Sequence, residues 1–388
     1  MDNNNYNKDE LEAPEWLTKR FLEDVLRQNE NNYNVKVNTY LCLGPATAKG
    51  EHFASIMFRI AVDFLVSEIP KHMSLILKTL PVKDGFKKNL VSNSYAFETE
   101  IKMYTEIIPK FHKILRDIGD ETILGARMIY SSLDPIKIII FEHLKIQGYK
   151  VHPTKYLETN EVDALLKKIC RWHAISFKLL KEVSKIYPAL IQMYNLRYFK
   201  GDKSIQAFKN SGFDLEDVRS FFHHSINGFL KLLYDQNFDP IYIDKFEKIK
   251  EVIVEKCRDI YSLQGDLCVL NHGGFTLKNI TVKIGFQVDF QFCIAAPLVR
   301  DLTYLRYDIL NPHSRDQHDK IIYKYHTLFV EILQKLEYNG KIPTLIDILA
   351  LIMVFMPFMC AVKDKVEMDD RLMEDPNFFL SLFVVQLN

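Results

Sequence analysis

The periodicity of the apolar residues changes once along this 388-residue chain, near Glu142. Before that point the runs "VKVNTYLCLG", "HFASIMFRIAVDFL", "SLILKTLP", "ARMIYSS" and "IKIIIFEHL" are short and rich in β-branched and aromatic residues, which is typical of strands. After it, "EVDALLKKICRWHAISFKLLKEV", "DVRSFFHHSINGFLKLLY" and "FEKIKEVIVEKCRDIY" have the spacing of amphipathic helices. This order predicts an α+β protein with two lobes, a small β-rich N-terminal lobe and a large α-helical C-terminal lobe.

The same pattern predicts the boundaries of the lobes. Residues 1–12 are Asn-rich and charged, with few apolar side chains, and we expect a disordered tail there. Residues 13–142 form the expected N-terminal lobe, a sheet with one further helix. Residues 143–388 form the helical C-terminal lobe, which is interrupted by a hairpin over residues 268–291.

Composition excludes several classes of protein. The 50 basic residues balance the 50 acidic ones, which argues against a nucleic-acid partner. The six cysteines are scattered without a CxxC pair, so neither zinc nor a disulfide framework is expected. The N-terminus lacks an apolar signal segment, and we expect a cytoplasmic protein. The apolar run Ile346–Val362 is shorter than a membrane span and contains Pro357, so it predicts a buried helix and no membrane partner. The oligomeric state is not determined by these features.

A lysine and an acid have the right types for a phosphate site. Lys78 is the one basic residue of the short apolar strand "SLILKTLP". The segment "SNSYAFETEIKMYTEIIPKF" predicts a helix whose apolar face consists of Phe97, Ile101, Tyr104 and Ile108. Glu98 and Glu100 border this face on opposite sides, and Glu100 is slightly closer to its centre. A lysine on an internal strand can contact phosphates if such an acid orients it.

The late segment "LNHGGFTLKNITVKIGFQVDFQ" contains the candidate metal ligands. It reads as a strand, a glycine turn, a loop ending at Asn279, and a hairpin that turns at Gly285 and leads to Asp289. Mg²⁺ prefers oxygen ligands, which the amide and the carboxylate supply. Lys78, Glu100, Asn279 and Asp289 together predict a site for ATP and Mg²⁺.

At these residues the chain resembles the ecdysteroid kinase-like family, which is related to choline kinase and the aminoglycoside phosphotransferases and shares the two-lobed protein-kinase-like fold. The resemblance extends roughly over residues 41–310. "KGEHFASIMFRI", with Gly50 and Ser55, resembles the family's glycine-loop strand. "LILKTLP" resembles its lysine strand and "FETEIKMYTEIIP" its glutamate helix, which implies an ion pair between Lys78 and Glu100.

Further motifs follow in the family's order. "IIIFEHL" resembles the hinge between the lobes, with Glu142 kept and His143 where the family has an acid. "CRWHAISF", "VLNHGGFTLKN", "VDFQ" and "PLVRDLTYL" resemble the four motifs that come next. The resemblance implies a role in nucleotide binding for Gly50, Ser55, Lys78, Glu100 and Glu142. It also implies Asn279 and Asp289 as metal ligands and Asp301 as a support that binds the backbone of the catalytic loop.

One departure from the family concerns the chemistry. The family's His-Gly-Asp motif is His272, Gly273 and Gly274 here, so the acid that takes or orients the acceptor's proton is missing. The nearest earlier acid, Asp266, is separated from the site by a strand of roughly 20 Å. Two alternatives stay open for His272, an acid–base role or a structural one with its ring bonded to backbone. For the two glycines, a tight turn that needs positive φ is the alternative to a lost catalytic function.

The sequence thus favours an ATP- and Mg²⁺-dependent phosphotransferase that acts on the hydroxyl of a small molecule, with turnover impaired at Gly274. The 27 Phe and 19 Tyr hint at an apolar, steroid-like acceptor, although most of these rings must form the core. The alternative is a catalytically silent pseudokinase that binds a nucleotide or a lipophilic small molecule.

Overall fold

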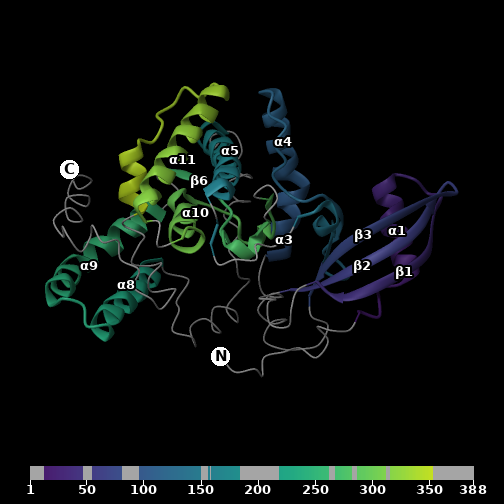
Figure 1. The fold of residues 1–388 in the computed structure, drawn as a ribbon, viewed down its shortest axis with the longest axis horizontal. Coiled ribbons are helices and arrows are strands. Elements are labelled where there is room, and N and C mark those ends of the chain that lie inside the picture. Colours follow the sequence, from purple (N-terminus) through teal and green to yellow (C-terminus); the bar gives the residue numbers. More distant parts are fainter. Residues whose placement is uncertain are drawn as a thin grey trace.

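A computed structural model describes the fold over most of the chain (Figure 1). The residues described are 13–46, 55–80, 96–149, 156–157, 159–183, 218–261, 267–281, 286–311 and 315–352. The sheet with its helix α1 lies at one end of the long axis, the helices α8, α9 and α11 lie towards the other end, and α5 lies between them and α4 (Figure 1). The expected N-terminal tail over residues 1–12 lies outside the described residues.

A five-stranded antiparallel sheet forms the N-terminal lobe. Its strands are β1 (Val35–Pro45), β2 (Ile56–Val66), β3 (Ile69–Thr79), β4 (Met128–Ser132) and β5 (Ile138–Glu142), in the spatial order β1-β2-β3-β5-β4. The five expected strands are all present, and β3 begins earlier than "SLILKTLP" predicted. Because β3 is central, its later half pairs with β2 on one side and β5 on the other.

One face of this sheet is covered by α1 (Lys19–Glu30). The helix begins after Thr18, whose hydroxyl accepts a hydrogen bond from the Phe21 amide at 3.2 Å. The buried side of α1 packs on the alternate residues of β2 that are also buried. These residues are Leu22, Val25, Leu26, Phe58, Ile60, Val62 and Phe64. The opposite face of β2 and β3 is therefore the one that carries Lys78.

The sequence predicted one continuous helix after β3, but the structure shows an interrupted one. It consists of α3 (Ala96–Lys102), a π-helical turn η2 (Met103–Ile107) and α4 (Ile108–Asp117). Pro109 has no N–H to donate to a carbonyl in the preceding turn, and the widened turn lies directly before it. The change leaves Glu100 on the α-helical part, next to the sheet.

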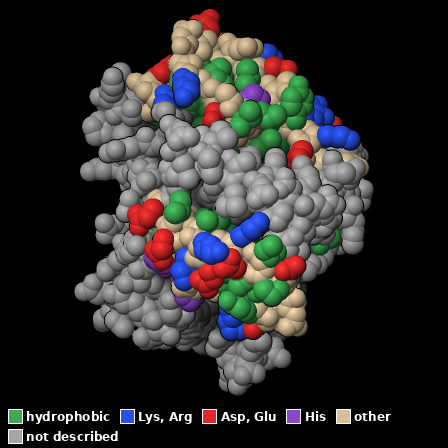
Figure 2. Space-filling model, turned by 90° about the vertical axis from the view of Figure 1, so that its left-hand side faces the viewer, with side chains coloured by type: hydrophobic (Ala, Val, Ile, Leu, Met, Phe, Trp, Pro, Cys, Tyr) green, Lys and Arg blue, Asp and Glu red, His purple; other side chains and the backbone are tan. Residues whose placement is uncertain are grey.

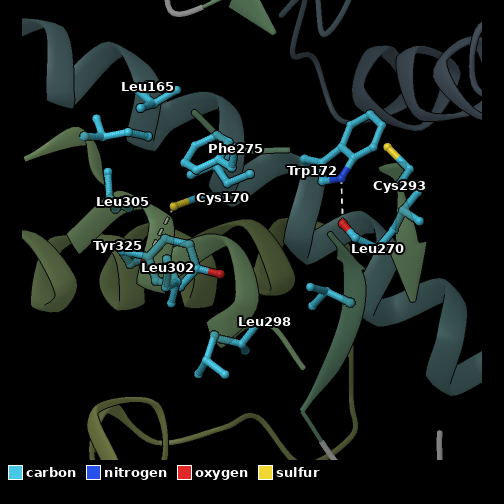
Figure 3. Close-up of a cluster of buried hydrophobic side chains, with 14 of the residues drawn as sticks. Leu165, Cys170, Trp172, Leu270, Phe275, Cys293, Leu298, Leu302, Leu305 and Tyr325 are labelled. Carbon is cyan, nitrogen blue, oxygen red and sulfur yellow. Dashed lines mark hydrogen bonds between the residues drawn. The ribbon is translucent and has the colours of Figure 1, made fainter. Parts of the chain in front are cut away.

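Helices dominate the C-terminal lobe. Among the described residues they include α5 (Thr159–Val183), α8 (Val218–Asp235), α9 (Pro240–Tyr261), α10 (Val299–Tyr304) and α11 (Arg315–Lys335). A short ladder of β6 (Cys268–Asn271) and β9 (Ile294–Pro297) lies among them, and β7 (Ile280–Thr281) pairs with β8 (Phe286–Gln287). Figure 3 shows how α5, β6, α10 and α11 send apolar side chains into one buried cluster. This cluster is the base on which the loop after β6 is built.

The C-terminal apolar run is helical where it is described. Residues 345–352 form a helix with Ile348, Leu351 and Ile352 buried, as the sequence predicted for a packed segment. The rest of the run lies outside the described residues. Over the part of the chain that the structure describes, none of the helices combines the length and the apolar character of a membrane span.

Charges on the helical side of the molecule are paired. On the described part of that face, basic and acidic side chains lie next to one another (Figure 2). Within α9, Lys248 lies 2.6 Å from Asp244 and Lys250 lies 2.9 Å from Glu247. These helical pairs stabilise the helix only weakly, by about 0.3–0.5 kcal/mol each. Each pair neutralises its own two charges locally.

Candidate active site

Strand β3 and helix α3 bring the predicted lysine and glutamate together. Lys78 pairs in register with Met57 on β2 and Ile139 on β5, and its side chain is almost fully buried. Its Nζ lies 2.5 Å from Glu100 Oε2, so the ion pair predicted from the sequence is present. Glu98, the other acid at the border of the helix face, instead binds Lys137 at 3.0 Å. The structure thereby distinguishes the two glutamates that the sequence left nearly equivalent.

The same ammonium group also reaches the hairpin of the C-terminal lobe. Lys78 Nζ lies 2.5 Å from Asp289 Oδ1, a contact between residues 211 positions apart. The other carboxylate oxygen, Oδ2, accepts a hydrogen bond from Gln291 Nε2 at 3.0 Å. Helix α3 contacts the turn Phe290–Phe292 directly after Asp289, which holds the two lobes together at this point. One ammonium therefore joins the sheet, the glutamate helix and the hairpin.

Asp289 has an unusual backbone conformation. Its φ of 68° and ψ of 61° lie in the left-handed region, which non-glycine residues rarely adopt. Such a conformation costs on the order of 1 kcal/mol and persists where the surroundings fix it. Aspartate tolerates the region better than most residues. The conformation aims the carboxylate at Lys78 while Phe290 enters the core against Trp172.

The electrostatics of this triad follow from one cation between two anions. Burial lowers the pKa of Lys78, but the charges of Asp289 and Glu100 outweigh burial and raise this pKa above its ordinary value. Burial raises the pKa of Glu100 to about 7, against the opposing charge of Lys78 and with a contribution from Asp289. Since two carboxylates share one ammonium, the group carries a net negative charge when all three side chains are ionised.

The hairpin brings Asn279 and Asp289 to the same end. Ile280 pairs with Gln287, and the Val288 amide donates to the Asn279 carbonyl at 3.0 Å. The side-chain Nδ2 of Asn279 donates to the Gly274 carbonyl at 2.9 Å, which leaves Oδ1 as the oxygen suited to a metal.

Magnesium fits this oxygen donor set because it is usually held by one or two protein oxygens together with phosphates and water. Within the described ranges, no cluster of three or more His, Cys, Asp or Glu side chains could hold a metal by itself. A magnesium site here would therefore depend on the oxygens of a bound phosphate.

Asp301 supports the loop as the resemblance implied. Its Oδ2 accepts the His272 amide at 2.6 Å and its Oδ1 accepts the Gly273 amide at 3.1 Å. Its own amide donates to Asn271 Oδ1 at 3.1 Å. Burial acts to raise the pKa of Asp301, yet the hydrogen bond from His173 and the loop amide outweigh it and the pKa is lowered. The carboxylate therefore stays ionised and holds the backbone of the loop.

His272 has the geometry of the structural alternative. The ring is fully buried, and Nε2 lies 3.0 Å from the Val288 carbonyl, so it donates to that oxygen. Burial lowers the pKa of His272 and keeps the ring neutral at physiological pH. The other ring nitrogen, Nδ1, is buried and has no hydrogen-bond partner in the described part of the protein.

The two adjacent glycines have different requirements. Gly273 has a φ of +77°, and a Cβ there would lie 2.0 Å from the Phe292 carbonyl oxygen, so only glycine fits. Gly274 has no such φ, and its Cβ would lie 3.3 Å from Asn279 Nδ2 and 3.5 Å from Phe292 Cδ2. The interpretation that both glycines relieve backbone strain is therefore correct for Gly273 and wrong for Gly274.

The remaining predicted residues are placed as follows. Ser55 is buried directly before β2, and Glu142 is half-buried at the end of β5, opposite Leu75. Gly50 lies outside the described residues. Sequence reasoning missed a double contact between β3 and the residue that follows β5. His143 Nδ1 lies 2.9 Å from Ser74 Oγ, and the His143 amide donates to the Ser74 carbonyl at 3.0 Å. No residue spacing in the sequence signals that contact.

Together, the sheet order, the buried lysine–glutamate pair and the supported loop define a two-lobed, protein-kinase-like protein. The model of the ecdysteroid kinase-like family matches residues 49–338, and the chain belongs to this family. Family membership assigns it a kinase-like function directed at small molecules. No curated protein matches the chain.

Several solved structures resemble the chain along most of its length. The ADP-bound aminoglycoside phosphotransferase APH(2'')-Ib is 14% identical, with 92% of this chain and 97% of that chain covered and a TM-score of 0.36. The streptomycin–ATP–APH(2'')-IIa ternary complex is 14% identical, with 90% and 95% covered and a TM-score of 0.33. An aminoglycoside-3'-phosphotransferase of type VIII is 11% identical, with 86% and 98% covered and a TM-score of 0.33. These TM-scores are low, so the fold is defined here by the strand order and the contacts described above.

Proposed function

We propose that this protein is a small-molecule phosphotransferase that uses ATP and Mg²⁺, with turnover slowed at Gly274. The observation that carries the proposal is the position of Lys78 Nζ, 2.5 Å from both Glu100 Oε2 and Asp289 Oδ1. A buried ammonium between the two lobes, oriented by a carboxylate from a neighbouring helix, is what contact with nucleotide phosphates requires.

Lys78, Glu100 and Asp289, the triad, would have different roles, and Asn279 would assist Asp289. Glu100 would keep Lys78 directed at the phosphates, while Asp289 and Asn279 would hold the metal. Bound magnesium would supply neutralisation of the phosphate charge. Asp301 would keep the loop between β6 and Asn279 in place through the amides of residues 272 and 273.

The contact between Lys78 and Asp289 has a consequence for the order of binding. In this structure the ammonium already neutralises the carboxylate that would bind the metal. A nucleotide phosphate would attract Lys78 and release Asp289 for the metal. We therefore expect Mg²⁺ alone to bind weakly and ATP with Mg²⁺ to bind cooperatively.

The acceptor would be a hydroxyl of a small apolar molecule, with a steroid-like alcohol as the first candidate.

Near Gly274, the nearest atoms to a Cβ are an amide nitrogen, an aromatic carbon and the Nδ1 of His272, none of them a carboxylate. A general base typically contributes about 10²–10⁴-fold to such a reaction. Positioning and electrostatics supply most of the remainder, so slow transfer is expected to persist.

The absent base also favours a second candidate function. A protein of this fold that binds a nucleotide without turnover would need Lys78, Glu100 and Asp289 but no acid at position 274. One that binds a lipophilic ligand would need neither. Asp289 would hold the metal in the enzyme and also in a silent protein that binds a nucleotide, so nucleotide binding alone does not separate these two functions. Transfer of phosphate to an acceptor does.

Thermal unfolding in the presence of ATP, with and without Mg²⁺, tests the nucleotide site. A ligand at 100 times its Kd stabilises the native state by about 2.7 kcal/mol. We expect a Tm increase with ATP and Mg²⁺ together and a much smaller one with either alone. Asp289→Asn should remove the increase, whereas Asp120→Asn, which breaks a distant ion pair with Arg171, should keep it. An identical increase in wild type and Asp289→Asn would contradict the proposed site.

A further inference from the structure

A chain of buried polar groups extends from α11 to the loop after β6. His173 on α5 lies with Nε2 3.2 Å from Asp301 Oδ2 and with Nδ1 2.7 Å from the hydroxyl of Tyr325 on α11. His173, Asp301 and Tyr325 are all fully buried. Since Asp301 also accepts the amides of His272 and Gly273, four hydrogen bonds connect α11 with the loop.

The chemistry of the three groups determines the direction of each bond. An ionised carboxylate only accepts, so Nε2 of His173 carries the proton and donates to Asp301. In the neutral form of the ring, Nδ1 is a lone-pair acceptor and the Tyr325 hydroxyl donates to it. Burial raises the pKa of Tyr325, which keeps this hydroxyl protonated.

The tyrosine ring is itself held firmly. It stacks on Phe329 with 5.9 Å between ring centroids, and Cys170 Sγ donates to its backbone carbonyl at 3.4 Å. Figure 3 shows Tyr325 surrounded by Cys170 and Leu302. A phenylalanine would satisfy this apolar environment equally well. The hydroxyl is therefore not needed for packing, and among the described residues its hydrogen-bond partner is His173.

We propose that His173 and Tyr325 are positioning residues that hold the loop after β6 in place through Asp301. The effect extends to the candidate metal ligand, because Asn279 Nδ2 donates to the carbonyl of Gly274, the residue after the two amides that Asp301 holds. The inference rests on the proposed function for its effect on nucleotide binding. Its structural part, the hold on the loop amides, does not depend on that function. Second-layer partners of this type commonly change metal affinity or activity by about 10–100-fold.

The test compares two conservative variants, Tyr325→Phe and Tyr40→Phe. Each removes one hydrogen-bonded hydroxyl. Tyr325 is buried, whereas Tyr40 is a partly exposed residue of the N-terminal lobe whose hydroxyl donates to the Leu17 carbonyl at 2.8 Å. The first readout is the amide proton resonance of Gly273 in protein labelled with ¹⁵N-glycine. The second is the Mg²⁺-dependent affinity for ATP, measured by calorimetry.

We expect Tyr325→Phe to move the Gly273 amide resonance and to weaken Mg²⁺-dependent ATP binding by about 10-fold. Tyr40→Phe should change neither, even if it lowers Tm by the same amount. In an Asp301→Asn background, Tyr325→Phe should have no further effect on either readout, because its action passes through that carboxylate.

An unchanged Gly273 resonance in Tyr325→Phe would overturn the inference, as would equal effects of the two tyrosine variants. Full additivity of Tyr325→Phe and Asp301→Asn would overturn it as well. If wild type fails to bind ATP, the proposed function fails, and the Gly273 resonance alone then decides the positioning role.

Discussion

Restoring an acid at position 274 is the sharpest perturbation of the proposed chemistry. Gly274 has no left-handed φ, and its three nearest atoms would lie 3.3, 3.5 and 3.8 Å from an added Cβ. The closest of these is Asn279 Nδ2, the end of a side chain that can shift by a few tenths of an ångström. We therefore expect Gly274→Asp to fold, with a change in stability below about 1 kcal/mol.

The expected gain in rate follows from the role of the acid. A positioned general base contributes about 10²–10⁴-fold, which corresponds to about 2.7–5.5 kcal/mol of barrier at 1.36 kcal/mol for each factor of ten. The assay is transfer of radiolabelled phosphate from the γ position of ATP to a panel of small hydroxylated molecules, with steroid alcohols included. We expect Gly274→Asp to exceed wild type by about 10²-fold or more on the true acceptor.

Gly274→Asn is the matched control, since it has nearly the same size and shape but no base. It should bind ATP as Gly274→Asp does and show no comparable gain in rate. If Gly274→Asp is folded, binds ATP and transfers phosphate to no member of the panel, the binding-protein alternative replaces the proposed enzyme. A gain of the same size in Gly274→Asn would refute the reasoning about the missing base.

Three further predictions concern stability. Gly273→Ala places a Cβ 2.0 Å from the Phe292 carbonyl oxygen at a φ of +77°. In urea unfolding we therefore expect the free energy of unfolding to fall by about 3 kcal/mol or more. A decrease as small as that of Gly274→Ala would contradict the geometry. The pKa of Glu100 is raised from 4.5 to about 7, so between these values the folded protein binds more protons than the unfolded chain and the free energy of unfolding falls as pH rises. Between pH 5 and 7.5 the free energy of unfolding should fall less in Glu100→Gln than in wild type. An equal fall in both proteins would disprove the assignment of this pH dependence to Glu100. Trp172→Phe removes the 2.6 Å hydrogen bond from Nε1 to the Leu270 carbonyl beneath the loop. In urea unfolding the free energy of unfolding should fall by about 1–3 kcal/mol. An unchanged free energy would show that this bond is dispensable.

Residue types and their order identified Lys78 and an acid on the next helix as candidates for one site, and the resemblance to the family implied the pairing with Glu100. A lysine in an apolar strand and an acid on the buried border of the next helix have few other partners. The choice between Glu98 and Glu100 needed coordinates, because both lie close to the same helix face. Lys137, directly before β5, decides it by binding Glu98.

Other contacts had no signature in the sequence. The direct bond between Lys78 and Asp289 depends on how the two lobes meet, and the sequence had assigned Asp289 to a metal alone. His173, beside Trp172 in the motif "CRWHAISF", is fully buried. Its partners Asp301 and Tyr325 come from helices 128 and 152 residues later, so only the packing of α5, α10 and α11 shows the network. The π-helical turn before α4 likewise has no apolar period that would predict it.

Calorimetric titration of ATP with Mg²⁺ into wild type, Lys78→Met and Lys137→Met tests the central claim most directly. Both substitutions break a lysine–glutamate pair between the sheet and α3, but only Lys78 also contacts Asp289. We predict that Lys78→Met weakens ATP binding by roughly 10–100-fold, the value of a lost charge-assisted bond of about 1.5–3 kcal/mol. Lys137→Met should bind as wild type does. Equal affinity in all three proteins, or binding that is indifferent to Mg²⁺, would contradict a nucleotide site built around Lys78.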